Sequence, residues 1–90
     1  MKHVTANRFW KSFDALPLEI QKLAREKFAL FISNPHHPSL RIRKMEGINE
    51  IWEGHITLSY VFTFRYIKLE GEIAIESLDI GIHDDVYNRA

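Results

Sequence analysis

Histidine and arginine side chains supply most of the reactive chemistry that this sequence offers. Histidine exchanges protons near neutral pH and can act as a general acid or base, whereas arginine and lysine bind anions. The chain has five histidines and no cysteine, which excludes a thiolate nucleophile and cysteine-ligated metal centres. His36 and His37 are adjacent in a proline-flanked loop and lack the i, i+4 spacing of a helical metal pair. We therefore expect no metal and no other cofactor.

Alternating patterns predict the strands that position the other candidates. Residues 58–67 alternate most clearly, with the aromatic side chains on one face. Further strands are predicted over 40–47, 48–57 and 73–83, with a hairpin turn at 69–72. By alternation, His83 and Arg65 share the face opposite to the aromatic one, together with Asp79 and His55. That face is predicted to be solvated or open to a ligand.

Two helices are predicted before these strands. Thr5 or Asn7 is the expected N-cap of a first helix that carries Phe9, Trp10 and Phe13 on one side. A second helix starts at Leu16-Pro17 and stops at Asn34-Pro35, because proline is tolerated only in the first turn of a helix. The sequence thus predicts an α+β fold, in which an N-terminal helical hairpin packs on one face of a four-stranded antiparallel sheet. Residues 1–90 are expected to form a single domain.

The charge of the chain is divided between its two halves. The 12 basic and 12 acidic residues give a net charge of zero, which argues against strong, diffuse binding to nucleic acid. Residues 1–45 hold nine basic and three acidic residues, a net charge of +6. Residues 46–90 hold three basic and nine acidic residues, a net charge of −6. Such an asymmetry either marks a binding surface or lets the two halves attract each other within one domain.

Hydropathy bears on the cellular location. The longest fully apolar run is residues 29–32, which is far too short to span a membrane. The first residues have no apolar core like that of a signal peptide. We therefore expect a cytoplasmic protein with no membrane partner.

Several short motifs follow one another in a characteristic order. After the predicted helical hairpin come NPHHPSL (34–40), RKMEG (43–47), WE (52–53) and IGIHDDVY (80–87). Their order and spacing resemble the RelE/ParE superfamily, the small bacterial toxins of type II toxin–antitoxin systems. The resemblance covers about residues 13–87, and the first and last motifs are its most specific parts.

The resemblance implies a toxin that a cognate antitoxin neutralises. RelE-like members cleave mRNA on the ribosome, which inhibits translation, whereas ParE-like members act on DNA gyrase and lack the nuclease residues. Fold alone does not separate the two activities. We favour the RelE-like branch, a metal-independent mRNA interferase, whose further partners are the ribosome and mRNA.

Cleavage by a ribose 2′-hydroxyl needs a base, cations that stabilise the phosphorane, and an acid for the leaving oxygen. Four positions match the nuclease pattern of the family: Arg43, Lys44, His83 and Tyr87. In the resulting hypothesis His83 is the general acid or base, and Tyr87 stacks on a base. Arg43, Lys44 and Arg65 hold phosphate, and His55 is a further catalytic candidate.

The sequence also departs from the nuclease pattern. Arginines that the family often carries are absent from the stretch 52–55 and from Val61, and Asp79 replaces another. An apolar valine cannot stabilise a phosphorane, Asp79 is expected to repel phosphate, and His55 can replace an arginine only if it is protonated. Two alternatives therefore stay open: a ParE-like toxin acting on DNA gyrase, or an interaction module without catalysis.

Overall fold

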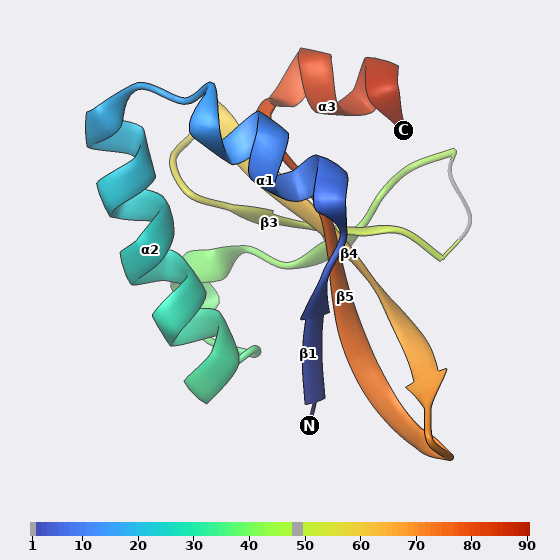
Figure 1. Cartoon of the computed structure of the whole chain (residues 1–90). Helices are drawn as coiled ribbons and strands as arrows, with labels where there is room; N and C mark the ends of the chain where they lie inside the picture. Colours follow the sequence, from blue (N-terminus) through green and yellow to red (C-terminus); the bar gives the residue numbers. More distant parts are fainter. Residues whose placement is uncertain (1, 48–49) are drawn as a thin grey trace.

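A twisted sheet with helices on both faces forms the body of the protein (Figure 1). The computed structural model describes residues 2–47 and 50–90. Its elements are, in chain order, β1 (Lys2–Thr5), α1 (Asn7–Asp14), α2 (Leu18–Ser33), the 3-10 turn η1 (Pro38–Leu40), β2 (Arg43–Lys44), β3 (Trp52–His55), β4 (Tyr60–Leu69), β5 (Glu72–Ile82) and α3 (His83–Arg89). Within these described ranges, no helix is long and apolar enough to cross a membrane.

The sheet has the strand order β1-β5-β4-β3-β2. Strands β2 to β5 form an antiparallel meander, as the sequence predicts. The prediction of a purely four-stranded antiparallel sheet is wrong, because β1 adds a parallel edge strand, with Lys2 opposite Ala74 and Thr5 opposite Ser77. This strand has only four residues, which is too short to show a clear alternating pattern.

The helical hairpin packs on the aromatic face of the sheet, which we call the helical face. Phe31 of α2 contacts Phe62 and Phe64 of β4, with ring centroids 5.1 and 4.9 Å apart. The packing confirms the predicted helical hairpin and its amphipathic spacing. The predicted cap of α1 is wrong, since its N-cap is Ala6 and no side chain caps the helix. Trp10 is 52% exposed, whereas Phe9 and Phe13 of the same helix are buried.

A β-bulge changes the alternation of β5. Thr63 pairs with Asp79 and Phe64 with Ser77, so that Leu78 has no partner in the register. An extra residue moves the side chains that follow it to the other face. For this reason Ile75 and Ile80 both lie in the core, whereas strict alternation predicts opposite faces for them.

The strands near the loops are shorter than predicted. β2 covers only Arg43–Lys44 instead of 40–47, because η1 and a left-handed Arg41 (φ 49°) precede it. β3 is likewise shorter than the predicted 48–57, and residues 48–49 lie outside the described residues. The hairpin turn is confirmed at Glu70 and Gly71, both of which have a positive φ, as a type I′ turn requires.

Helix α3 follows β5 directly and covers part of the face expected to be open. Val86 packs with Met45 and Val61 on the side of the sheet away from α1 and α2, which we call the distal face. Gly81 permits this approach, since a Cβ atom there would lie 3.0 Å from Arg89 Nη2. Helix α3 contacts β5 and β4, and at its start His83 comes within 3.7 Å of Glu53 on β3.

Candidate functional site

A buried carboxylate lies at the centre of the candidate site on the distal face. Glu53 of β3 is 0% exposed, and its register partner on β2 is Arg43. Arg43 Nε donates a hydrogen bond to Glu53 Oε1. The other oxygen, Oε2, is buried, has no hydrogen-bond partner among the described residues, and lies 3.7 Å from His83 Nε2. Arg43 thus compensates the buried charge while one carboxylate oxygen faces an imidazole.

His83 and Tyr87 reach this carboxylate from α3. The backbone N–H of His83 donates to Ser59 O at 3.0 Å, which anchors the start of the helix. One turn later Tyr87 stacks on His83, with ring centroids 4.1 Å apart and an interplanar angle of 28°. The i, i+4 spacing places both rings on one side of the helix. The His83 side chain remains 38% exposed, so a substrate can reach it.

The environment of Glu53 also affects its neighbours. Burial and the Glu53 carboxylate raise the pKa of Tyr87, so its hydroxyl keeps its proton at neutral pH. The Arg43 guanidinium uses Nε for Glu53, which leaves its terminal nitrogens to donate to an anion. A carboxylate beside an imidazole stabilises the positive charge that the ring acquires on taking a proton. These groups together can support general acid–base chemistry on an anionic substrate.

His55 lies on the same face of β3 as Glu53. Burial lowers the pKa of His55 and outweighs the Glu53 carboxylate, which acts in the opposite direction. Its Nδ1 is buried without a hydrogen-bond partner among the residues that the structure describes. Burial thus favours the neutral form of the ring, and a role of His55 in place of an arginine stays a prediction.

We expect the ring of His55 to titrate below the ordinary histidine value of 6.5, and to be neutral at pH 7. Two-dimensional NMR of the imidazole nitrogens between pH 4.5 and 8 measures this directly. The ordinary histidine value of 6.5 is the reference for the midpoint. A His55 midpoint at or above 6.5 would contradict the effect of its burial.

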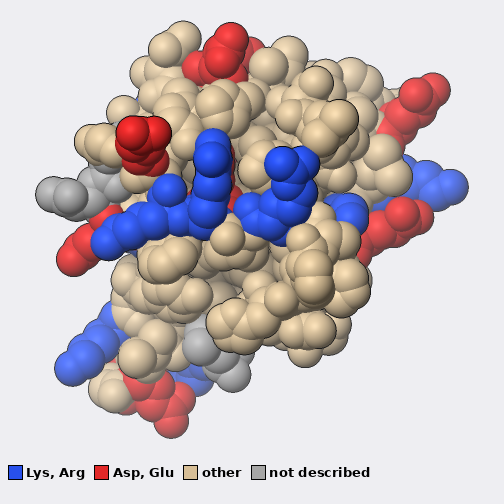
Figure 2. All heavy atoms as spheres, turned by 180° about the vertical axis from the view of Figure 1, so that it is seen from behind, with Lys and Arg blue, Asp and Glu red and all other residues tan. Residues whose placement is uncertain are grey.

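Two of the predicted phosphate-binding residues lie away from the site. Lys44 pairs with Trp52 and so faces the opposite side of β2 from Arg43, with its Nζ 6.0 Å from the centre of the Trp52 ring. Arg65 forms an ion pair with Glu76 at 2.7 Å, on strands β4 and β5. Figure 2 shows Lys and Arg side chains in a row across the face turned away from the view of Figure 1. Of the three predicted cations, Arg43 alone contacts the buried carboxylate.

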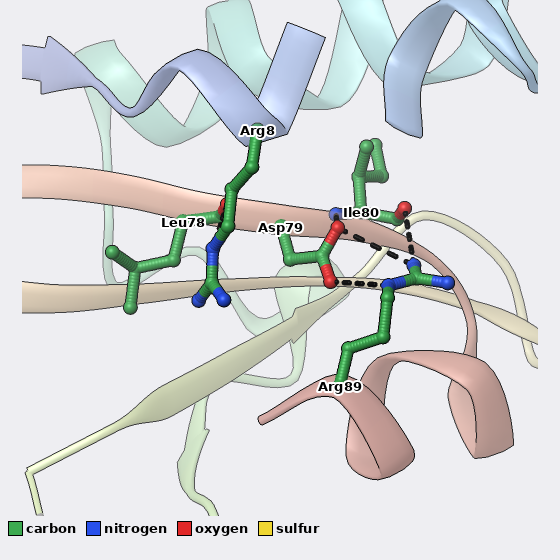
Figure 3. A network of polar contacts seen from close by, with 5 residues as sticks. All are labelled: Arg8, Leu78, Asp79, Ile80 and Arg89. Carbon is green, nitrogen blue, oxygen red and sulfur yellow. Dashed lines mark hydrogen bonds and ion pairs between the residues drawn. The ribbon is translucent and has the colours of Figure 1, made fainter. Parts of the chain in front are cut away.

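Asp79 has a structural partner that explains how its charge is tolerated. It is 3% exposed, and Arg89 Nε and Nη2 donate to its two oxygens at 2.8 and 3.3 Å (Figure 3). Although burial opposes it, hydrogen bonds from Arg89, Ser12 and the Ile80 backbone hold the pKa of Asp79 below its usual value. The repulsion of phosphate expected from Asp79 is therefore offset locally by Arg89.

Two residues of the site, Glu53 and Arg89, are not among the predicted site residues. Glu53 is part of the WE motif, but the register that pairs it with Arg43 is not visible in the sequence. Arg89 could have been noticed only with α3 in hand, where it occupies the last turn. Within residues 2–47 and 50–90, no group of three or more histidine and acidic side chains could hold a metal ion.

An α1–α2 hairpin on one face of a sheet and a short helix on the other make up a fold that this chain shares with solved YafQ, RelE and YoeB/ParE toxins. The resemblance indicated by the sequence motifs is thereby confirmed at the level of the fold. In sequence, no family model matches the chain, and no curated protein matches it.

The similarity to individual toxins is structural. The chain is similar to YafQ from E. coli, with a TM-score of 0.74, 9% identity, and coverage of 96% of this chain and 97% of that one. A YoeB/ParE toxin from Agrobacterium tumefaciens gives a TM-score of 0.69 and 16% identity, over 92% of this chain and 99% of that one. RelE in the archaeal RelE–RelB complex from Pyrococcus horikoshii gives a TM-score of 0.66 and 13% identity, over 90% of this chain and 92% of that one.

Proposed function

We propose that this chain is the toxin of a type II toxin–antitoxin pair and inhibits translation by cleaving mRNA on the ribosome. The observation that supports the proposal most strongly is the convergence of His83, Tyr87 and Arg43 on the buried carboxylate of Glu53. These side chains come from α3, β2 and β3, so the fold and not the local sequence brings them together.

The reaction needs no metal. The ribose 2′-oxygen attacks the adjacent phosphorus while its proton passes to a base, and the bond to the 5′-oxygen breaks as that oxygen takes a proton. The products are a 2′,3′-cyclic phosphate and a 5′-hydroxyl end. His83 takes the proton from the 2′-oxygen and gives it to the leaving 5′-oxygen. The terminal nitrogens of Arg43 stabilise the charge on phosphorus, and Glu53 stabilises the protonated imidazole.

The structural neighbours support a protein partner. RelE from Pyrococcus horikoshii and YafQ from E. coli were solved in complexes with RelB and DinJ, the latter described as a toxin–antitoxin complex. By the same relationship, this chain binds a cognate antitoxin in the cytoplasm. The ribosome and mRNA are its further partners in this proposal.

One observation favours a second candidate function. Val61 stands where the family often has an arginine, and it is fully buried beneath α3. Arg43 is already paired with an acidic side chain. These features suit a ParE-like toxin that acts on DNA gyrase without cleaving RNA, or an interaction module without catalysis.

Induced expression in E. coli separates these candidates. The proposed interferase stops growth and reduces methionine incorporation about tenfold or more before DNA synthesis falls, because translation loses its template. Co-expression of the antitoxin, which we expect in a small adjacent reading frame, restores growth. Loss of gyrase supercoiling in a purified assay, with methionine incorporation maintained, contradicts the interferase and selects the gyrase-directed toxin.

A further inference from the structure

Two aromatic side chains at one end of the helical face have no part in the proposed catalysis. Trp52 of β3 and Tyr66 of β4 meet edge to face, with ring centroids 6.0 Å apart and an interplanar angle of 81°. Trp52 is half-buried, and Tyr66 is 42% exposed. Phenylalanines of the same face, such as Phe62 and Phe64, are completely buried. The Trp52–Tyr66 pair therefore offers aromatic surface to a ligand.

The aromatic pair lies between two hollows in the surface. One hollow, of about 340 Å³, separates the rings from the loop after α2 and is lined by His36, His37 and Arg41 among others. The second, of about 250 Å³, is lined by the same rings together with Lys44 and Glu50. The larger volume is at the lower end of the range of small-ligand sites. The two hollows together form a shallow recess around the rings.

The polar groups of this recess are mostly donors and cations. Lys44 Nζ lies 6.0 Å from the centre of the Trp52 ring. His37 Nδ1 accepts a hydrogen bond from the backbone N–H of Ser39 at 3.1 Å, so a neutral His37 carries its proton on Nε2 and can donate to a ligand. Aromatic faces with adjacent cations and donors are the chemistry that binds unpaired nucleotides, through base stacking and phosphate contacts.

The position of β2 links this recess to the candidate catalytic site. β2 is the edge strand of the sheet, and its two residues face opposite sides. Arg43 lies on the distal face with Glu53, whereas Lys44 lies on the helical face with Trp52. An extended RNA strand that crosses this edge can therefore contact Arg43 with one phosphate and Lys44 with a neighbouring one.

The geometry points to a second RNA subsite, in which Trp52 and Tyr66 stack on an unpaired base and Lys44 holds its phosphate. This inference rests on the proposed function, since it extends the path of the same RNA strand. The ligand is single-stranded RNA, because the bases of a duplex are already paired and stacked on one another.

The fluorescence of Trp52 tests the subsite directly. Trp10→Phe leaves Trp52 as the remaining tryptophan, and His83→Ala in the same chain keeps the RNA intact. We expect a single-stranded RNA oligonucleotide to quench the Trp52 emission about twofold, and a duplex of the same sequence to leave it unchanged.

Lys44→Glu should weaken RNA binding about tenfold, as measured by the anisotropy of labelled RNA. Lys22→Glu makes the same charge change on the exposed side of α2 and should change the RNA affinity less than about twofold.

The possible results distinguish the subsite from the proposed function. If RNA binds without changing the Trp52 emission, or if transcripts are cleaved in cells while the oligonucleotide does not bind, the subsite is overturned and the interferase stands. Quenching by the antitoxin but not by RNA also overturns it and assigns the recess to a protein partner. Absence of both RNA binding and transcript cleavage removes the subsite and the proposed function together.

Discussion

His83→Ala is expected to abolish the growth arrest caused by the induced protein and to lower the rate of transcript cleavage about 10²–10⁴-fold. The substitution removes the one imidazole that faces the free oxygen of Glu53, at 3.7 Å, and remains open to substrate. The fold should tolerate it, because the side chain is partly exposed and its main contact is the stack on Tyr87. Cleavage in a reconstituted translation system with purified toxin measures the rate.

The neighbouring residue provides the matched control. The side chain of Asp84 is 92% exposed, and its contact with His83 is a long one of 3.5 Å. Asp84→Ala should therefore cleave within about threefold of the unchanged chain, since exposed ion pairs contribute little. If His83→Ala is folded by circular dichroism and still arrests growth, His83 is not the proton carrier of this site.

Arg89→Ala is expected to reduce the free energy of unfolding by about 2–3 kcal/mol. The substitution leaves the buried carboxylate of Asp79 without the two hydrogen bonds that Arg89 donates. The effect should stay below that of breaking a fully buried pair, because the Arg89 side chain is 45% exposed. Urea denaturation at pH 7 gives the value.

Two comparisons keep this prediction specific. Arg65→Ala breaks the more exposed Arg65–Glu76 pair and should cost less than about 1 kcal/mol. Adding Asp79→Asn to Arg89→Ala should recover part of the loss, because no buried charge is then left unpaired. Equal losses for Arg65→Ala and Arg89→Ala would show that the Asp79–Arg89 pair has no special role.

The same pair gives stability a pH dependence of known sign. The folded-state pKa of Asp79 lies below the ordinary value of 3.8, so the unfolded chain binds the proton more readily. The stabilisation of the folded state by ionised Asp79 is complete at pH values above 3.8. It is lost as the pH falls through the folded-state pKa of Asp79. The difference in stability between the unchanged chain and Arg89→Ala should accordingly be largest near neutral pH and shrink below pH 4.

The long elements could be predicted from the sequence because each carries its own periodic pattern. The apolar spacing of α2, the alternation of β4 and the turn at Glu70-Gly71 are local signals, and all three are present in the structure. β1 is too short for a periodic signal and forms only by pairing with β5. The extra residue Leu78 changes the face of the residues around it, which no local alternation reveals.

The candidate site was predictable in its residue types but not in its pairings. His83, Tyr87 and Arg43 were selected from motifs, and α3 and β2 place them together. The partners of Glu53 and Asp79 each lie 10 residues away along the chain, so the sequence does not show that these two charges are paired. The opposed halves of the sequence also meet in the fold, through the Lys2–Glu70 and Arg43–Glu53 ion pairs.

Mapping the ends of a reporter transcript during induction tests the central claim most directly. The account predicts new 5′-hydroxyl ends, with 2′,3′-cyclic phosphate on the upstream fragments, for the unchanged chain and for Asp84→Ala. It predicts none for folded His83→Ala. Growth arrest without new transcript ends, or the same ends in His83→Ala, would contradict a ribonuclease centred on His83 and Glu53.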